Sequence, residues 1–142
     1  MGVEALKKMV FYLITVFLII VIGAVCIIFC QGPQECAVEF LESYGWVVGE
    51  MLEEEKVKIP MEFDTIYSDY NELQKQAGLD LLEYRGKDAV RYTYEIKNFP
   101  YNTTSKVRAN VIVVGEKAVA GDVMTVELGG FMYSLNYLKS GK

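Results

Sequence analysis

The chain has 142 residues, with 14 basic and 19 acidic side chains, a net charge of −5 and no histidine. The acidic balance argues against general binding to nucleic acid or to anionic lipid headgroups. Without histidine the chain lacks the most common general base and the most common zinc ligand, and three cysteines are too few for a disulfide framework. We therefore expect no cofactor, no metal site and no nucleic-acid partner.

Residues 9–30 form an uncharged run of 22 residues, of which 15 are Leu, Ile, Phe or Val. A helix of that length rises about 33 Å, enough to cross a hydrocarbon core of about 30 Å. Lys7 and Lys8 precede the run and the next basic residue is Lys56, a bias that places the N-terminus in the cytoplasm. The sequence therefore predicts a single-pass plasma-membrane protein: cytoplasmic residues 1–8, a transmembrane helix over 9–30 in contact with the bilayer, and an extracytoplasmic domain over 31–142.

A cleaved signal peptide is the alternative for this N-terminal run. The apolar core of a signal peptide is about 7 to 15 residues long and ends in small residues. Residues 23–26 resemble a lipoprotein cleavage box only loosely, because bulky Val25 stands where a small residue is expected. We therefore expect the helix to be retained. Cys30 could pair with Cys36, although a buried Cys36 on the next helix is the simpler interpretation.

The outer domain shows both helical and strand periodicity, bounded by Gly and Pro. The expected elements are a helix over 34–44 that Gly45 ends, an extended piece over 46–48, an acidic solvated loop over 49–55, a short strand over 55–59, a helix with apolar residues between 63 and 77, strands over 90–97, 106–114 and 118–128, and a short helix or turn over 131–138. The architecture is predicted to be α+β, with a small antiparallel sheet and helices packed on one face.

The two strands around Gly115-Glu116-Lys117 are predicted to form a hairpin. A three-residue turn sets their register. It would place Val113 opposite Val119, Val111 opposite Gly121, Ala109 opposite Val123 and Val107 opposite Thr125. Gly121 within a strand indicates a bulge or a closely approaching backbone.

The face of the sheet that the helices leave uncovered is the first candidate binding surface. Two arginines, an amide and a carboxylate there could contact a peptide or a small polar ligand: Arg91, Arg108, Asn110 and Asp122. The alternative is a sheet face that simply meets water. A second candidate is a pocket between helix and sheet for a small ligand or lipid, lined by Tyr67, Tyr70, Tyr92 and Tyr94.

No set of catalytic residues is recognisable in the sequence. A Ser-Lys hydrolase would need no histidine, but the serines of the outer domain stand in no known catalytic signature: Ser43, Ser68, Ser105, Ser134 and Ser140. We therefore expect a protein without catalysis of its own.

Four segments resemble bacterial proteins collected as domain of unknown function 4830: FLESYGW, IPMEFDTIYSDYNELQKQAGLDL, YRGKDAVRYTYEIKNFP and VRANVIVVGEKAVAGDVMTVELGGFM. The resemblance covers most of residues 36–135. It implies an extracytoplasmic domain tethered to the membrane of a Firmicutes-type bacterium, and it implies no activity and no functional residues. The expected function is a non-catalytic binding or interaction module whose partner is an envelope or membrane protein, with a ligand-sensing module as the alternative.

Overall fold

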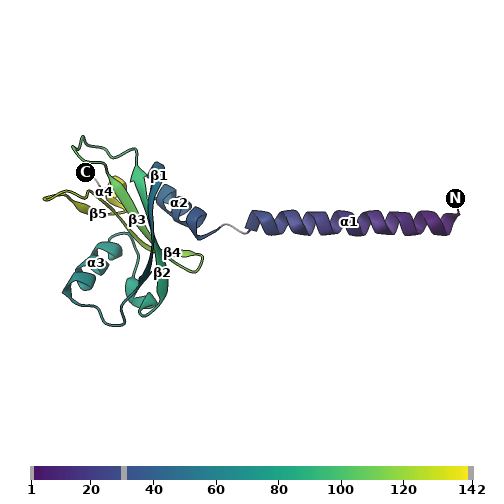
Figure 1. The fold of residues 1–142 in the computed structure, drawn as a ribbon, viewed down its shortest axis with the longest axis horizontal. Coiled ribbons are helices and arrows are strands. Elements are labelled where there is room, and N and C mark those ends of the chain that lie inside the picture. The colour runs from purple at the N-terminus through teal and green to yellow at the C-terminus, as the bar shows by residue number, and fades with distance from the viewer. Residues whose placement is uncertain (1, 30–31, 141–142) are drawn as a thin grey trace. The chain divides into compact units, whose positions relative to one another are not determined.

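The computed structural model describes residues 2–29 and 32–140, without the side chains of residues 22–29 (Figure 1). The chain divides into two compact units, Met1–Gln31 and Gly32–Lys142. Cys30 lies outside the described residues, so its pairing with half-buried Cys36 stays a prediction.

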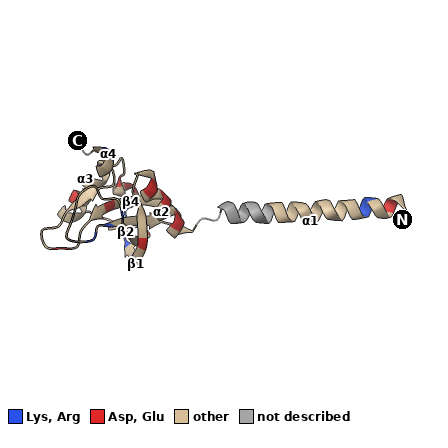
Figure 2. Cartoon of the chain, turned by 90° about the horizontal axis from the view of Figure 1, so that it is seen from above, with Lys and Arg blue, Asp and Glu red and all other residues tan. Residues whose placement is uncertain are grey.

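The first unit is a single helix, α1, over Val3–Phe29. Its described charged residues lie at the N-terminal end, where Glu4 and Lys7 form an ion pair (Figure 2). Beyond them the helix exposes large apolar side chains, among them Phe17 and Ile19. Among the residues that the structure describes, no helix is both long and apolar enough to cross a membrane. The predicted span over residues 9–30 lies partly outside the described side chains.

The second unit is built on a five-stranded antiparallel sheet in the order β1-β2-β3-β4-β5. The strands are β1 (Val48–Lys58), β2 (Asp88–Ile96), β3 (Arg108–Val114), β4 (Lys117–Met124) and β5 (Met132–Ser134). This arrangement confirms the predicted α+β class and the antiparallel sheet.

Strand β1 corrects the acidic loop expected over residues 49–55. The three consecutive glutamates lie within one strand, where Glu54 is opposite Tyr92 and Glu55 is opposite Arg91. Glutamate has low strand propensity, but tertiary pairing overrides such a preference. Register shifts between Val48 and Glu53 mark where β1 departs from a regular ladder.

Helices cover both faces of the sheet, and the prediction that they pack on one face is wrong (Figure 1). Helix α2 (Pro33–Ser43) and the short α4 (Tyr137–Ser140) pack on one face, here called the α2 face. Helix α3 (Thr65–Lys75) and the 3-10 turn η1 (Leu81–Tyr84) pack on the other, the α3 face.

The ends of both long helices follow local signals in the sequence. Helix α2 begins with Pro33 after Gly32, and Gly45, at a φ of 94°, follows it as predicted. Helix α3 begins later than its apolar pattern suggests, because the side chain of Asp64 accepts a hydrogen bond from the Tyr67 N–H and caps the first turn.

The sheet separates two apolar clusters. On the α2 face, side chains from α2 meet residues of the central strands and buried Trp46, which lies between α2 and β1. On the α3 face the cluster is smaller and consists of Ile59, Leu81, Ala89, Ile112, Val119 and Ala120. Alternate residues of β1 to β4 supply the two clusters, as the side-chain period of a strand requires.

The β3–β4 hairpin keeps part of the predicted register. Val111 is opposite Gly121 and Ala109 is opposite Val123, as predicted. Val113, however, is opposite Ala118, because the turn contains two residues and a bulge follows it. The extra residue therefore sits in the strand at Val119, which packs on the α3 face.

The chain after β4 folds back as β5 and α4. The predicted short helix or turn over residues 131–138 is thus partly a strand, and Leu135 is fully buried. A Cβ on Gly121 would lie 2.7 Å from Leu135 Cδ1 and 2.7 Å from the Asn110 backbone oxygen. This confirms the close approach predicted at Gly121.

Candidate functional site

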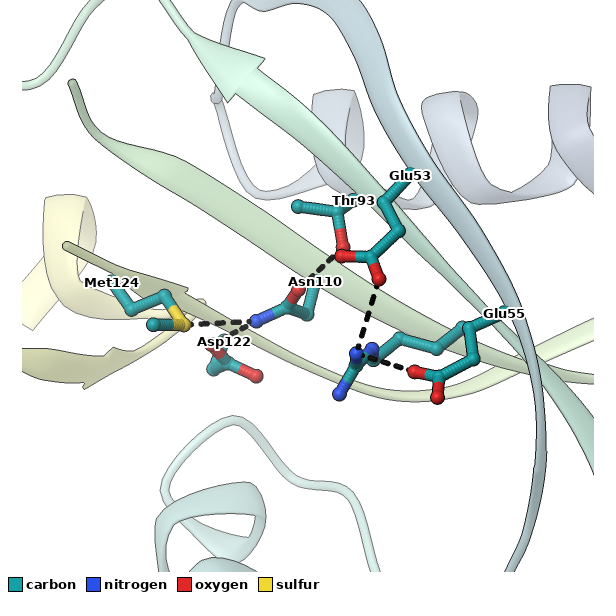
Figure 3. A network of polar contacts seen from close by, with 7 residues as sticks. Glu53, Glu55, Thr93, Asn110, Asp122 and Met124 are labelled. Carbon is teal, nitrogen blue, oxygen red and sulfur yellow. Dashed lines mark hydrogen bonds and ion pairs between the residues drawn. The ribbon is translucent and has the colours of Figure 1, made fainter. Parts of the chain in front are cut away.

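A chain of polar side chains crosses the α3 face of the sheet (Figure 3). The Thr93 hydroxyl donates to Asn110 Oδ1 at 2.8 Å, and Asn110 Nδ2 donates to Asp122 Oδ1 at 3.0 Å. Asn110 Nδ2 also lies 3.2 Å from the sulfur of Met124. Because its side chains come from β2, β3 and β4, the network ties the three central strands together.

Tyr70 of helix α3 adds a further hydrogen bond to this network. The Tyr70 hydroxyl donates to Asp122 Oδ2 at 2.8 Å, so both carboxylate oxygens of Asp122 are hydrogen-bonded. Asp122 is 2% exposed. Burial raises the pKa of Asp122 to about 6, and the hydrogen bonds from Asn110 and Tyr70 oppose that rise.

The predicted binding surface therefore does not lie open. Asn110 and Asp122 are buried beneath α3 and serve the packing of the domain. Arg91 forms ion pairs with Glu55 at 2.5 Å and with Glu53 at 3.9 Å. Arg108 is half-buried, opposite Met124. The period-two pattern correctly placed these four residues on one face, but it could not show that a helix covers that face.

The four tyrosines of the alternative pocket do not come together. Tyr92 and Tyr94 are buried in the α2-face cluster, whereas Tyr70 packs against the α3-face cluster. The Tyr94 hydroxyl donates to the Gln34 carbonyl at 3.3 Å, and burial raises the pKa of Tyr94 to about 12. Tyr67 and Tyr70 line a different hollow.

That hollow is a groove of about 470 Å³ between α3 and β5, and we call it the α3 groove. Its lining residues are Ile66, Tyr67, Asp69, Tyr70, Leu73 and Met132. The side chains are mostly apolar, and Asp69 is the one carboxylate among them. Ile66 is 77% exposed and Met132 is 46% exposed. An exposed apolar groove with one charged residue is typical of a binding site for an apolar group.

Sequence reasoning placed Tyr67 and Tyr70 in a pocket with Tyr92 and Tyr94, and it missed the α3 groove because the apolar pattern of a helix does not show which of its residues stay exposed. The apolar stripe of α3 is broader than the surface that the helix buries. Asn71 and Gln74 are the buried residues of α3, and Gln74 Oε1 accepts a hydrogen bond from the Gly121 N–H at 2.9 Å. Ile66 is thereby turned outward.

A larger hollow of about 610 Å³ lies where β1, β2 and the β3–β4 turn meet. Strand residues and Gly115 line it, with Lys56, Lys58 and Asp88 as its charged members. Only three of its lining side chains are apolar, Val57, Ala89 and Val90, whereas apolar and aromatic side chains dominate the α3 groove. The α3 groove is therefore the better candidate site.

Several serine hydroxyls are engaged with oxygen acceptors. Ser43 donates to the Phe40 carbonyl, Ser140 to the Tyr137 carbonyl and Ser105 to the Glu127 carboxylate. Within residues 2–29 and 32–140, no three His, Cys, Asp or Glu side chains are grouped to hold a metal ion. The less favoured alternative of a Ser-Lys hydrolase stays untested.

A family model described as "Domain of unknown function (DUF4830)" matches residues 40–123. The chain belongs to the DUF4830 family. The match confirms the resemblance seen in the sequence, and it covers β1 to β4 together with α3. Most of the Asp122 network and most of the α3 groove thus lie within the DUF4830 region, although Met124 and Met132 follow it. No curated protein and no solved structure matches the chain.

Proposed function

We propose that this DUF4830 protein is a membrane-anchored, non-catalytic binding module. Its outer domain takes up an apolar segment of another envelope protein in the α3 groove. The observation that carries the proposal is the exposed apolar groove, which is backed by a hydrogen-bonded network beneath α3.

The anchor is supported by the sequence of residues 9–30, which contains no charged side chain. The basic residues Lys7 and Lys8 favour a cytoplasmic N-terminus, and residues 31–142 would then lie outside the cytoplasm. In this proposal the bilayer is a partner through residues 9–30.

The groove favours a polypeptide segment with apolar side chains and a basic residue. Ile66, Leu73 and Met132 offer apolar contact area, and Asp69 can pair with a lysine or arginine of the partner. The net charge of residues 31–142 is −6, since Glu4, Lys7 and Lys8 are the only charged residues before them. A basic partner would be attracted to such a domain.

Protease treatment of spheroplasts tests the anchor and its orientation. We expect the full chain to remain with the membrane after carbonate extraction, and we expect external protease to degrade residues 31–142. A chain that is released as a soluble protein, or an outer domain that protease leaves intact until the cells are lysed, would contradict the anchored arrangement.

Site-directed photo-crosslinking in cells tests the groove. A photoreactive residue at Ile66 or Met132 should yield an adduct with one defined protein, and Asp69→Lys should reduce its amount. A photoreactive residue at Met61, which is 68% exposed and does not line the groove, is the matched control. Equal adducts from Met61 and Ile66 would contradict the proposal.

A small apolar ligand is the second candidate for the groove. The volume of about 470 Å³ lies in the range of small-molecule sites. A saturable rise in the melting temperature of the full chain with a single fatty acid, lost in Leu73→Asp, would favour this ligand over a protein segment.

A further inference from the structure

Strand β1 is the longest strand of the sheet and lies at its edge (Figure 1). In the described part of the chain, no strand pairs with its outer side. Residues 50–56 are exposed throughout. Because an unpaired edge offers free N–H and C=O groups, such a strand is a template for another strand.

The backbone of residues 53–58 is regular enough to accept a partner. The Ile59 N–H donates to the Lys87 carbonyl at 3.0 Å, and the ladder between β1 and β2 continues without a register shift from Lys58 to Glu53. In an antiparallel ladder, alternate residues bond to the same neighbour. The outward-pointing backbone groups are therefore those of Glu54, Lys56 and Lys58.

Glu54 and Lys56 carry opposite charges, and this favours a second copy of the same strand as the partner. Glu54 lies opposite Tyr92 and Lys56 opposite Val90, so both side chains stand on the α2 face. Within the described residues, neither side chain forms a hydrogen bond or an ion pair. In the part of the chain that the structure describes, the residues that line the hollow beside Lys56 and Lys58 belong to β1, β2 and the β3–β4 turn and not to a helix.

We propose that two copies of the chain pair antiparallel through the outer edges of β1, about a two-fold axis at Glu55. In this register Glu54 of each copy lies opposite Lys56 of the other. The two opposite-charge pairs are then also the hydrogen-bonded pairs of the new ladder. The interface is isologous, and the two sheets join into one continuous sheet.

Neighbouring registers are less favourable. A two-fold axis at Glu54 places that carboxylate against its own copy. An axis at Lys56 pairs Glu54 with Lys58 but sets two Lys56 ammonium groups together, and within the described residues Lys56 has no carboxylate of its own chain to compensate for this. An axis at Glu55 also opposes two like residues, but each Glu55 is already paired with Arg91 of its own chain. The charge pattern of β1 therefore selects one register.

A charge-exchange experiment on the full chain in detergent solution tests the proposal. Sedimentation equilibrium over a range of protein concentrations should show a monomer–dimer equilibrium for the unmodified chain. Glu54→Lys alone and Lys56→Glu alone each convert two attractive pairs into two repulsive ones. We expect each to weaken the dimer by about tenfold or more.

Recombination of the charges distinguishes the proposal from misfolding. A mixture of the Glu54→Lys chain and the Lys56→Glu chain should form heterodimers, and the double variant should regain the homodimer, because both restore the opposite-charge pairs. A chain that stays monomeric at all concentrations, or single variants that associate as the unmodified chain does, would overturn the proposal. The second result would place the contact elsewhere, for example in residues 9–30.

Discussion

The hydroxyl of Tyr70 and the carboxylate of Asp122 are joined by a 2.8 Å hydrogen bond between α3 and β4. The two residues are far apart in the sequence, and Asp122 is almost completely buried. This contact connects the helix that bears the α3 groove to the central sheet. The position of α3, and with it the shape of the α3 groove, therefore depends on this hydrogen bond.

Replacing Tyr70 with phenylalanine should lower the free energy of unfolding by about 1 to 3 kcal/mol, because Asp122 Oδ2 would be left buried without its donor. Urea unfolding of the full chain, followed by Trp46 fluorescence, measures the change. Tyr67→Phe is the control on the same helix, since the Tyr67 hydroxyl makes no hydrogen bond among the described residues. A loss as large in Tyr67→Phe would show that the effect does not come from the Asp122 contact.

Asp122 should make the stability of the domain depend on pH. Its pKa rises from 3.8 to about 6 in the folded chain, chiefly through burial. A raised folded-state pKa stabilises the fold below the unfolded pKa, and this contribution is lost as the pH rises through about 6. The unfolding free energy of the unmodified chain minus that of Asp122→Asn should therefore increase as the pH falls from 7 to 4, by at most about 3 kcal/mol.

Urea unfolding at several pH values checks this sign. The difference between the two chains cancels the titration of the other carboxylates, which the variant retains. A difference that is constant over the interval, or that shrinks as the pH falls, would refute the assignment to Asp122.

Gly121→Ala should destabilise the fold by about 1 to 3 kcal/mol, because the added methyl group would press on the Asn110 carbonyl and on Leu135. Leu135→Ala removes one of the two obstacles. In a double-mutant cycle, the cost of Gly121→Ala should therefore be smaller in the Leu135→Ala background. Strict additivity of the two substitutions would contradict the close contact.

Trp46 is the only tryptophan of the chain, and its Nε1–H donates to the Leu135 carbonyl at 2.9 Å. Trp46→Phe should cost about 1 to 3 kcal/mol, because that carbonyl then loses its donor in a buried place. Thermal unfolding followed by circular dichroism measures the loss. The neighbouring Val47→Ala, at a side chain that is 52% exposed, should have little effect.

The elements that the sequence predicted well depend on short-range information. Pro33 and Gly45 bracket α2, and the alternation from Val90 to Ile96 identified β2 and its two faces. The pair Val111–Gly121 followed from the position of the turn. Each of these signals lies within a few residues of the structure that it specifies.

Strand β1 shows where such signals fail. Three consecutive glutamates indicate a solvated loop, yet Arg91 of β2 neutralises Glu55 and approaches Glu53 on one side of the strand. The partner that makes the strand favourable stands far along the chain. Residues 49–55 alone give no indication that Arg91 will be their partner.

The sequence by itself determined the family, the α+β class, the uncharged run over residues 9–30 and the faces of the central strands. Only the tertiary structure decided that α3 docks on the side opposite α2, which buries Asp122 and opens the α3 groove. The physical reason is that periodicity specifies which side of an element is apolar, whereas the choice between two apolar faces depends on long-range contacts such as those of Tyr70 and Gln74.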